Sequence, residues 1–140
     1  GDDLLRAVFL VQKEVADRLT AQPGRRSYGF LSVRTQFAAV PRTLFPVPPS
    51  AFRPPPKVDS AVVLLEPRAP DEDPARFLDF AGACFRHKRK TIRNNLAGRF
   101  PLDLLDACPE SGLRAEQLAL PQLTDLYNRL HQASAGVARE

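Results

Sequence analysis

The sequence predicts an α/β fold that changes near residue 66 into a small all-helical region. Three observations predict it. Apolar runs that suit strands occur only in the first part, at residues 7–11 and in the C-terminal half of residues 58–65. Residues 66–74 then form a linker with three prolines and four acids, and beyond it apolar residues recur at helical spacing. We therefore expect a first domain at residues 1–67 and a helical domain at residues 68–140.

Composition narrows the class of protein. The 140 residues are 44% hydrophobic with a net charge of +4, which excludes wholesale disorder. No apolar run approaches the roughly 20 residues of a membrane span, and the acidic N-terminus does not resemble a targeting segment, so we expect a cytoplasmic protein. Cys84 and Cys108 have neither a CxxC partner nor a histidine at ligand spacing, so we expect no metal site and two indifferent thiols. The sequence contains no methionine, which indicates a processed piece of a longer protein.

The elements expected before residue 66 are a strand at 7–11, helices at 14–20 and 30–39, and strands at 43–47 and 58–65. The run at 7–11 is apolar at every position, which is typical of a strand covered on both faces. Phe30, Val33 and Phe37 favour a helix for the ambiguous segment 30–39. The run at 58–65 should cross the interior of the sheet.

Proline dominates the segment between the last two strands. Six of the twelve residues 45–56 are proline: Pro46, Pro48, Pro49, Pro54, Pro55 and Pro56. Because proline fixes φ and lacks an N–H donor, this segment must be a stiff, extended loop and cannot be a central strand.

The region after the linker predicts a small helical bundle. Asp73 and Pro74 are typical of an N-cap and a first helical residue. The helix that they begin carries an apolar stripe: Phe77, Phe80, Ala81, Cys84 and Phe85. Further helices are expected around residues 92–96, at 102–105 and at 121–130, followed by a frayed tail from Gln132.

Phe52 is the first candidate functional residue. It precedes the rigid Pro54–Pro56 arm, which leads directly into the apolar strand. A ring held in this way suits stacking on a planar ligand, including an unstacked base. Two other interpretations remain open: a simple core residue, or a proline-rich ligand for another domain.

The second candidate is a basic segment. Residues 86–99 contain no acid and six cations: Arg86, Lys88, Arg89, Lys90, Arg93 and Arg99. This concentration produces a local positive field that suits phosphates, although a solvated basic surface has the same composition. Asn94 and Asn95 are candidates for hydrogen bonds to sugars or base edges. His87 should be exposed or face RNA, and His131 has no evident partner.

These residues together resemble the bacterial small-subunit rRNA adenine N6,N6-dimethyltransferases. The resemblance runs from about residue 7 to residue 130. It rests on VFLVQKEVADRL (8–19), YGFLSV (28–33), FPVPPSAFRPPPKVDSAVV (45–63) and HKRKTIRNNL (87–96).

The resemblance implies an S-adenosylmethionine-dependent enzyme with a Rossmann-like domain and a C-terminal helical rRNA-binding domain. Such enzymes dimethylate two adjacent adenosines in a hairpin near the 3′ end of small-subunit rRNA, and their partner is the pre-30S ribosomal subunit. On this basis residues 1–67 correspond to the last strands and helices of the catalytic domain. Phe52 matches the aromatic residue that stacks on the target adenine. The expected RNA-binding residues are Arg53, Lys57, Ser60, Arg86, His87, Lys88, Arg89, Lys90, Arg93 and Asn94.

The sequence departs from the family in several ways. The glycine-rich cofactor motif, the acidic ribose-binding residue and the Asn-Leu-Pro-Tyr-type motif are absent, so we expect this chain alone to be inactive and to bind no cofactor. Its apolar strands could then pair between chains. Ala119 stands where the family often has a serine helix cap, a loss of about 1 kcal/mol. Two alternatives remain: a large-subunit rRNA methylase of the macrolide-resistance type, and a non-catalytic RNA-binding or ribosome-assembly module.

Overall fold

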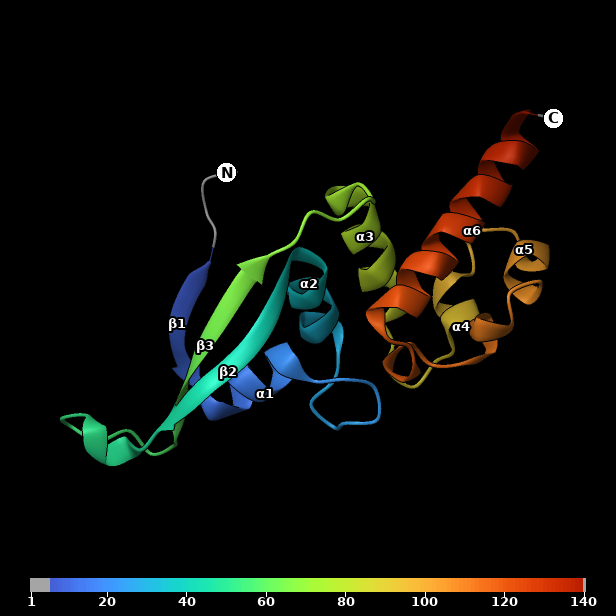
Figure 1. Ribbon diagram of the computed structural model, residues 1–140. Coiled ribbons are helices and arrows are strands. Elements are labelled where there is room, and N and C mark those ends of the chain that lie inside the picture. Colours follow the sequence, from blue (N-terminus) through green and yellow to red (C-terminus); the bar gives the residue numbers. More distant parts are fainter. Residues whose placement is uncertain (1–5, 140) are drawn as a thin grey trace. The chain divides into compact units, whose positions relative to one another are not determined.

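A computed structural model describes the backbone of residues 6–139 and the side chains of residues 6–135. The chain divides into two compact units, which we call unit 1 (Gly1–Pro70) and unit 2 (Asp71–Glu140). Unit 1 contains a sheet with helices, and the described part of unit 2 consists of helices and short turns (Figure 1). Each unit is described by itself below.

Unit 1 is a three-stranded antiparallel sheet with two helices. The strands are β1 (Ala7–Gln12), β2 (Ala39–Val47) and β3 (Ser60–Pro67), and the helices are α1 (Lys13–Thr20) and α2 (Phe30–Ala38). The strand order is β1-β3-β2, so the apolar strand β3 is central, as the sequence predicts. The helix favoured at residues 30–39 is confirmed by α2.

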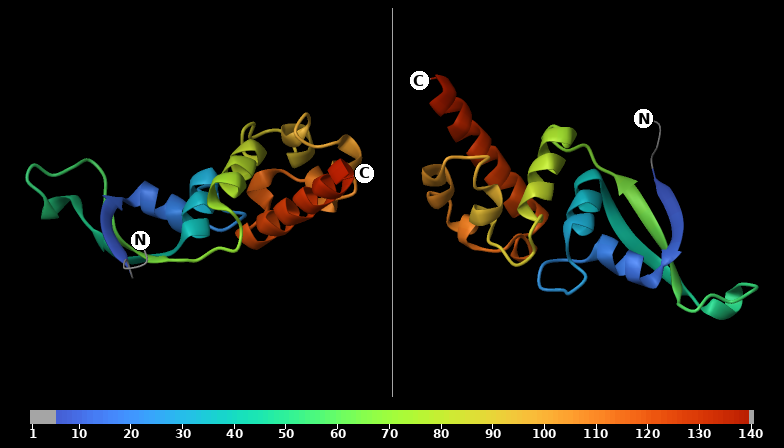
Figure 2. Two further views of the ribbon diagram at one scale, coloured as in Figure 1. Left: turned by 90° about the horizontal axis from the view of Figure 1, so that it is seen from above. Right: turned by 180° about the vertical axis from the view of Figure 1, so that it is seen from behind.

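Both helices lie on the same face of this sheet (Figures 1 and 2). Ala16 of α1 packs against Ala61 and Val63 of β3, and all three are buried. The Gln36 amide on α2 donates hydrogen bonds to the carbonyls of Leu19 (3.2 Å) and Ala21 (2.7 Å). These bonds satisfy carbonyls at the C-terminus of α1 and fix the two helices against each other.

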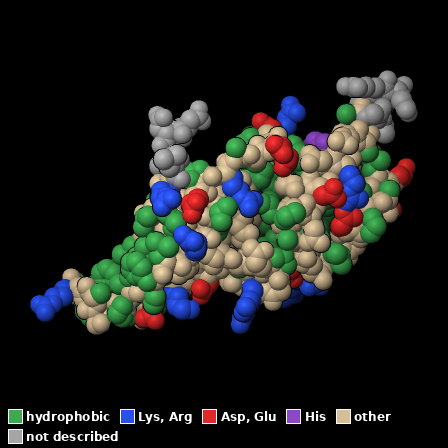
Figure 3. All heavy atoms as spheres, in the orientation of Figure 1, with side chains coloured by type: hydrophobic (Ala, Val, Ile, Leu, Met, Phe, Trp, Pro, Cys, Tyr) green, Lys and Arg blue, Asp and Glu red, His purple; other side chains and the backbone are tan. Residues whose placement is uncertain are grey.

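The opposite face of the sheet is uncovered in the described chain. Val8 and Leu10 of β1 are 58% and 52% exposed, and Phe45 of β2 is 52% exposed. Pairing in register with Leu64 and Val62 places their side chains on the face away from the helices. The expectation that the run at 7–11 is covered on both faces is therefore wrong for this chain (Figure 3). Continuous apolarity alone does not show whether both faces of a strand are covered.

Strand β2 is longer than predicted. It begins at Ala39 instead of residue 43 and ends at Val47 as predicted. Phe45, Pro46 and Val47, which open the proline segment, pair with β3. The strand tolerates Pro41 and Pro46 because it is an edge strand among the described elements, which leaves one side of its backbone without ladder bonds. The loop therefore starts at Pro48, and the prediction that the proline segment is no central strand is confirmed.

Unit 2 contains α3 (Pro74–Cys84), α4 (Ile92–Leu96), α5 (Leu102–Asp106) and α6 (Leu120–Arg139). Helix α3 begins as predicted, since the Asp73 carboxylate accepts a hydrogen bond from the Arg76 amide at 3.0 Å. The unit is built around fully buried apolar side chains from every helix: Phe77, Cys84, Ile92, Leu96, Leu105, Leu123, Leu126 and Leu130.

Helix α6 differs from its prediction at both ends. Its backbone is helical to Arg139, although the sequence predicts a frayed tail from Gln132. At the other end, the side-chain oxygen of Gln122 accepts a hydrogen bond from the Ala119 amide at 2.8 Å. This bond is one half of a capping box, so the missing serine at residue 119 leaves only the other half unmade.

Candidate functional site

The loop that carries Phe52 joins β2 to β3, and we call residues 48–59 the proline loop. It contains one short 3₁₀ turn, Pro49–Ala51, and the amide of Phe52 donates to the Pro49 carbonyl at 3.1 Å. The Phe52 side chain is half-buried, whereas Arg53 and Lys57 are exposed. Ser60 is the first residue of β3 and pairs with Gln12 and Val47. The ring is thus presented at the end of the sheet.

The proline loop keeps its shape with few hydrogen bonds. The side chains of residues 48–59 form no hydrogen bond or ion pair with any other described residue. Its backbone forms the two hydrogen bonds of the 3₁₀ turn and accepts one from the Lys13 amide at the Asp59 carbonyl, 2.9 Å long. Five of its twelve residues are proline, and their fixed φ supplies the stiffness.

The cations of the second candidate lie on a loop between α3 and α4. Residues 86–90, here called the basic loop, have no helical backbone and separate the two helices. All five side chains are exposed. Arg86, Lys88, Arg89 and Lys90 form no ion pair within the part of the chain that the structure describes. Four positive charges on five consecutive residues are thus available to an anionic partner.

Asn95 fixes the conformation of the basic loop. Its Nδ2 donates to the carbonyls of Cys84 (2.9 Å) and His87 (3.1 Å), and its Oδ1 accepts from the His87 amide at 3.1 Å. The interpretation of Asn95 as a partner of sugars or base edges is therefore wrong, because its amide is used inside the protein. The sequence shows two adjacent asparagines. It does not show that the Asn95 side chain bonds to the basic loop while the Asn94 side chain is exposed.

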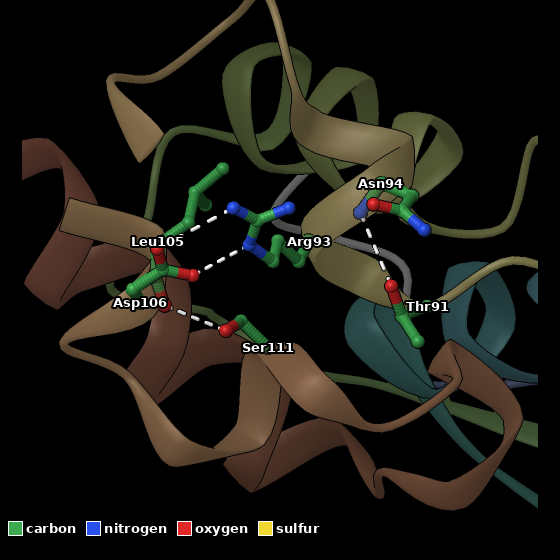
Figure 4. Close-up of polar contacts among 6 residues, drawn as sticks. All are labelled: Thr91, Arg93, Asn94, Leu105, Asp106 and Ser111. Atoms are coloured by element: carbon green, nitrogen blue, oxygen red, sulfur yellow. Dashed lines mark hydrogen bonds and ion pairs between the residues drawn. The ribbon is translucent and has the colours of Figure 1, made fainter. Parts of the chain in front are cut away.

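Arg93 and Asn94 lie on α4, next to the basic loop (Figure 4). The Arg93 Nε donates to Asp106 of α5 at 2.5 Å, so its charge is partly neutralised within the unit. This hydrogen bond raises the pKa of Arg93 and lowers that of Asp106. The Asn94 side chain points away from this pair in Figure 4, is exposed and bonds to no other described residue. Its backbone amide donates a hydrogen bond of 3.2 Å to Oγ1 of Thr91, which is the N-cap of α4.

The described residues show no metal centre. No cluster of three or more His, Cys, Asp or Glu side chains occurs among them. Gly24 and Gly98 have positive φ in turns, and nothing lies within 4 Å of a Cβ built on either. In addition, no described helix is long and apolar enough to cross a bilayer.

The two cysteines lie in the interior of unit 2. Both are buried and unpaired. Burial raises the pKa of the Cys84 thiol to about 12. A thiol with such a pKa is inert at neutral pH, so neither a nucleophile nor a disulfide is indicated here.

Comparison with known proteins decides the family. The family model described as "Ribosomal RNA adenine dimethylase" matches residues 2–132. The chain belongs to the ribosomal RNA adenine dimethylase family. Among curated members, it is 45% identical over 125 residues to the ribosomal RNA small subunit methyltransferase A of Idiomarina loihiensis, covering 86% of this chain and 43% of that protein. The protein of the same name from Synechocystis sp. is 47% identical over 131 residues, with 88% and 46% covered.

Two solved structures have the same fold as this chain. A dimethyladenosine transferase from Plasmodium falciparum matches with a TM-score of 0.80 at 23% identity, over 92% of this chain and 58% of that one. The 23S rRNA methyltransferase ErmE matches with a TM-score of 0.70 at 26% identity, over 91% of this chain and 55% of that one. This chain therefore has the α/β architecture of its family, and it spans about half the length of the curated relatives it matches.

Proposed function

We propose that this chain forms the adenine-stacking and RNA-binding half of an enzyme that dimethylates two adjacent adenosines near the 3′ end of small-subunit rRNA. Membership of the dimethylase family supports the reaction, and the names of the curated relatives favour the small subunit over the large-subunit alternative. The basic loop carries the RNA-binding part of the proposal, because its four exposed cations lack partners among the described residues. Phosphate groups of the rRNA hairpin in the pre-30S subunit would supply the partners.

The proposed role of Phe52 is to hold the extruded target adenine. A base must leave its stack before its exocyclic amine can be methylated, and a ring then replaces the lost stacking. Base–aromatic stacking contributes about 1–3 kcal/mol per base. Arg53, Lys57 and Ser60 flank the ring along the chain and would contact the adjoining backbone. The stiffness of the proline loop lowers the entropy lost when the base binds.

The finer fold proposal concerns the sheet of unit 1. We infer that β1, β3 and β2 are the last strands of a Rossmann-like sheet, with unit 2 as the helical rRNA-binding domain. The uncovered apolar face and the unpaired edge of β1 among the described elements support this assignment. S-adenosylmethionine would bind to the remainder of that domain, because the family's glycine-rich cofactor motif does not occur in this sequence. The chain alone would then be inactive, and the assembled enzyme would act in the cytoplasm on ribosome precursors.

A non-catalytic RNA-binding module is the second candidate. It is favoured by the absence of the cofactor motif from this sequence. The two proposals agree on RNA binding by unit 2 and differ in what Phe52 does.

The test has two parts. Calorimetry should show that this chain binds small-subunit rRNA but not S-adenosylmethionine. The full-length protein that carries the chain should transfer methyl groups to unmethylated 30S subunits. Micromolar binding of S-adenosylmethionine to this chain would contradict the proposal that the cofactor binds to the remainder of the domain. Full-length protein that binds the subunit without methylating it would favour the non-catalytic module.

A further inference from the structure

Unit 2 contains a hollow whose lining includes no residue of the proline loop or of the basic loop, although Arg99 from the end of the basic segment belongs to it. Its volume is about 510 Å³, and its walls come from α3, from the turn after α4 and from α6. The lining residues are Arg76, Asp79, Phe80, Arg99, Phe100, His131 and Ser134. Volumes of this order are typical of small-molecule sites and are sufficient for one nucleotide.

Aromatic rings form the apolar part of this hollow. The ring of Phe100 contacts those of Phe80 and His131 edge-to-face, with centroids 6.2 Å and 5.5 Å apart. His131 also lies 4.1 Å from the Tyr127 ring, and its Nδ1 is 2.9 Å from the Tyr127 carbonyl, to which it must donate. Phe80 is buried, whereas Phe100 and His131 are only half-buried. The cluster therefore leaves two fixed aromatic side chains open to a planar ligand.

The charged groups of the hollow favour an anion. Arg99 is paired with Asp79 at 2.8 Å, so these two charges offset each other. Arg76 is exposed, and its guanidinium forms no ion pair with any described residue. The lining thus keeps one uncompensated positive charge beside the rings, in a geometry that suits one phosphate.

We propose that this hollow binds a single unpaired nucleotide of the RNA substrate, with the base against Phe100 and His131 and its phosphate on Arg76. The inference rests on the proposed function, since it assumes that unit 2 meets RNA. It adds a second point of contact that reads an unstacked base, whereas the basic loop contacts only backbone charge. Any base has a stacking face, so the site should prefer single-stranded RNA without strong sequence selectivity.

The first experiment follows amide chemical shifts of the ¹⁵N-labelled full chain by NMR. Adenosine 5′-monophosphate should shift the amides of Arg99, Phe100 and Ser134 in a saturable way. Ribose 5-phosphate, which lacks the base, should bind at least fivefold more weakly. Equal binding of the two probes would make the hollow a simple phosphate site and overturn the proposal. An absence of shifts with either probe and with a single-stranded RNA decamer would also overturn it.

The second experiment measures the affinity of variants for that decamer. Phe100→Leu should weaken binding about fivefold to tenfold, and Phe100→Tyr, which keeps a ring, should bind within twofold of the parent. Arg76→Gln should weaken binding severalfold and lower the salt slope by about one unit. Because Arg76 is exposed, this variant remains informative if Phe100→Leu fails to fold. Arg42→Gln on β2 removes the same charge outside unit 2 and is the control.

Failure of this inference is distinguishable from failure of the proposed function. If basic-loop variants weaken binding to the rRNA hairpin while Phe100→Leu and Arg76→Gln bind normally, only the nucleotide site is refuted. If none of them changes the affinity, RNA binding by unit 2 is refuted as well.

Discussion

The proline loop and the basic loop are both exposed segments with a candidate function, but different interactions keep them in shape. In the proline loop, covalent rings fix the backbone, and no side chain of residues 48–59 bonds to another described residue. In the basic loop, one asparagine from the following helix holds the chain through three hydrogen bonds of 2.9–3.1 Å. The rigidity that proline gives to a backbone can be recognised in the sequence. The hydrogen bonds by which the Asn95 side chain holds the basic loop cannot.

The largest effect is expected from reversing charge on the basic loop. Arg89→Glu combined with Lys90→Glu should weaken binding of the small-subunit rRNA hairpin on the order of a hundredfold, at roughly 1.5 kcal/mol for each charged contact. The dependence of log K on log salt should flatten by about one unit for each lost phosphate contact. Titrations at several salt concentrations measure both quantities.

The control for this pair is Arg25→Glu with Arg26→Glu, which makes the same change of charge in an exposed turn of unit 1. If the control lowers the affinity as much, net charge explains the effect. If the slope stays unchanged in the loop variant, the basic loop is merely a solvated surface.

Asn95→Ala should loosen the basic loop without removing a charge. The half-buried amide serves two carbonyls and one N–H group, so its loss should lower the free energy of unfolding by about 1–3 kcal/mol. Its neighbour gives a matched control, because Asn94→Ala removes an exposed amide and should change stability by less than about 0.5 kcal/mol. Urea unfolding measures both. Equal losses in the two variants would refute the role assigned to Asn95.

Substitution in the proline loop should lower stability less than substitution of Asn95. Pro55→Ala should cost only about 0.4–1 kcal/mol, because no hydrogen bond is lost and only the unfolded chain gains freedom. The same variant should increase the mobility of the Phe52 amide in heteronuclear NOE measurements. A loss of several kcal/mol would mean that the loop depends on contacts instead of on its prolines.

The smallest effect concerns the ion pair of Arg93. The pKa of Asp106 is lowered by the hydrogen bond from Arg93, so its contribution to stability is present above the unfolded-state pKa and is lost as the pH falls through the lower folded-state value. The urea midpoint of the parent should therefore exceed that of Asp106→Asn at neutral pH. The difference should start to shrink as the pH falls below about 4 and should vanish only below the lowered pKa of Asp106. A constant difference down to pH 2 would show that the pair does not titrate.

The sequence was sufficient for features that depend on local chemistry. The apolar run before residue 66 identified the central strand β3, and Asp73 with Pro74 identified the start of α3. The proline segment correctly excluded a central strand. Phe52 and the basic segment stood out because their residue types are rare in these arrangements.

Features that depend on distant partners escaped sequence analysis. Apolarity at residues 7–11 does not say that one face of β1 lacks a cover in this chain. Pairing of Arg93 with Asp106 joins residues 13 apart in the sequence, and the ring cluster of Phe80, Phe100 and His131 joins three separate segments. The sequence gives the number of positive charges in a basic segment. Which of these charges pair with carboxylates of the same chain depends on the fold.

The most direct test of the account is single-turnover methylation by the full-length protein that carries this chain, with the affinity for the 30S subunit measured in parallel. Replacing Phe52 by leucine should slow methyl transfer about tenfold or more while the affinity stays within twofold, and tyrosine at the same position should restore the rate. Methylation by the leucine variant at the parental rate would contradict the assignment of Phe52 to the target adenine.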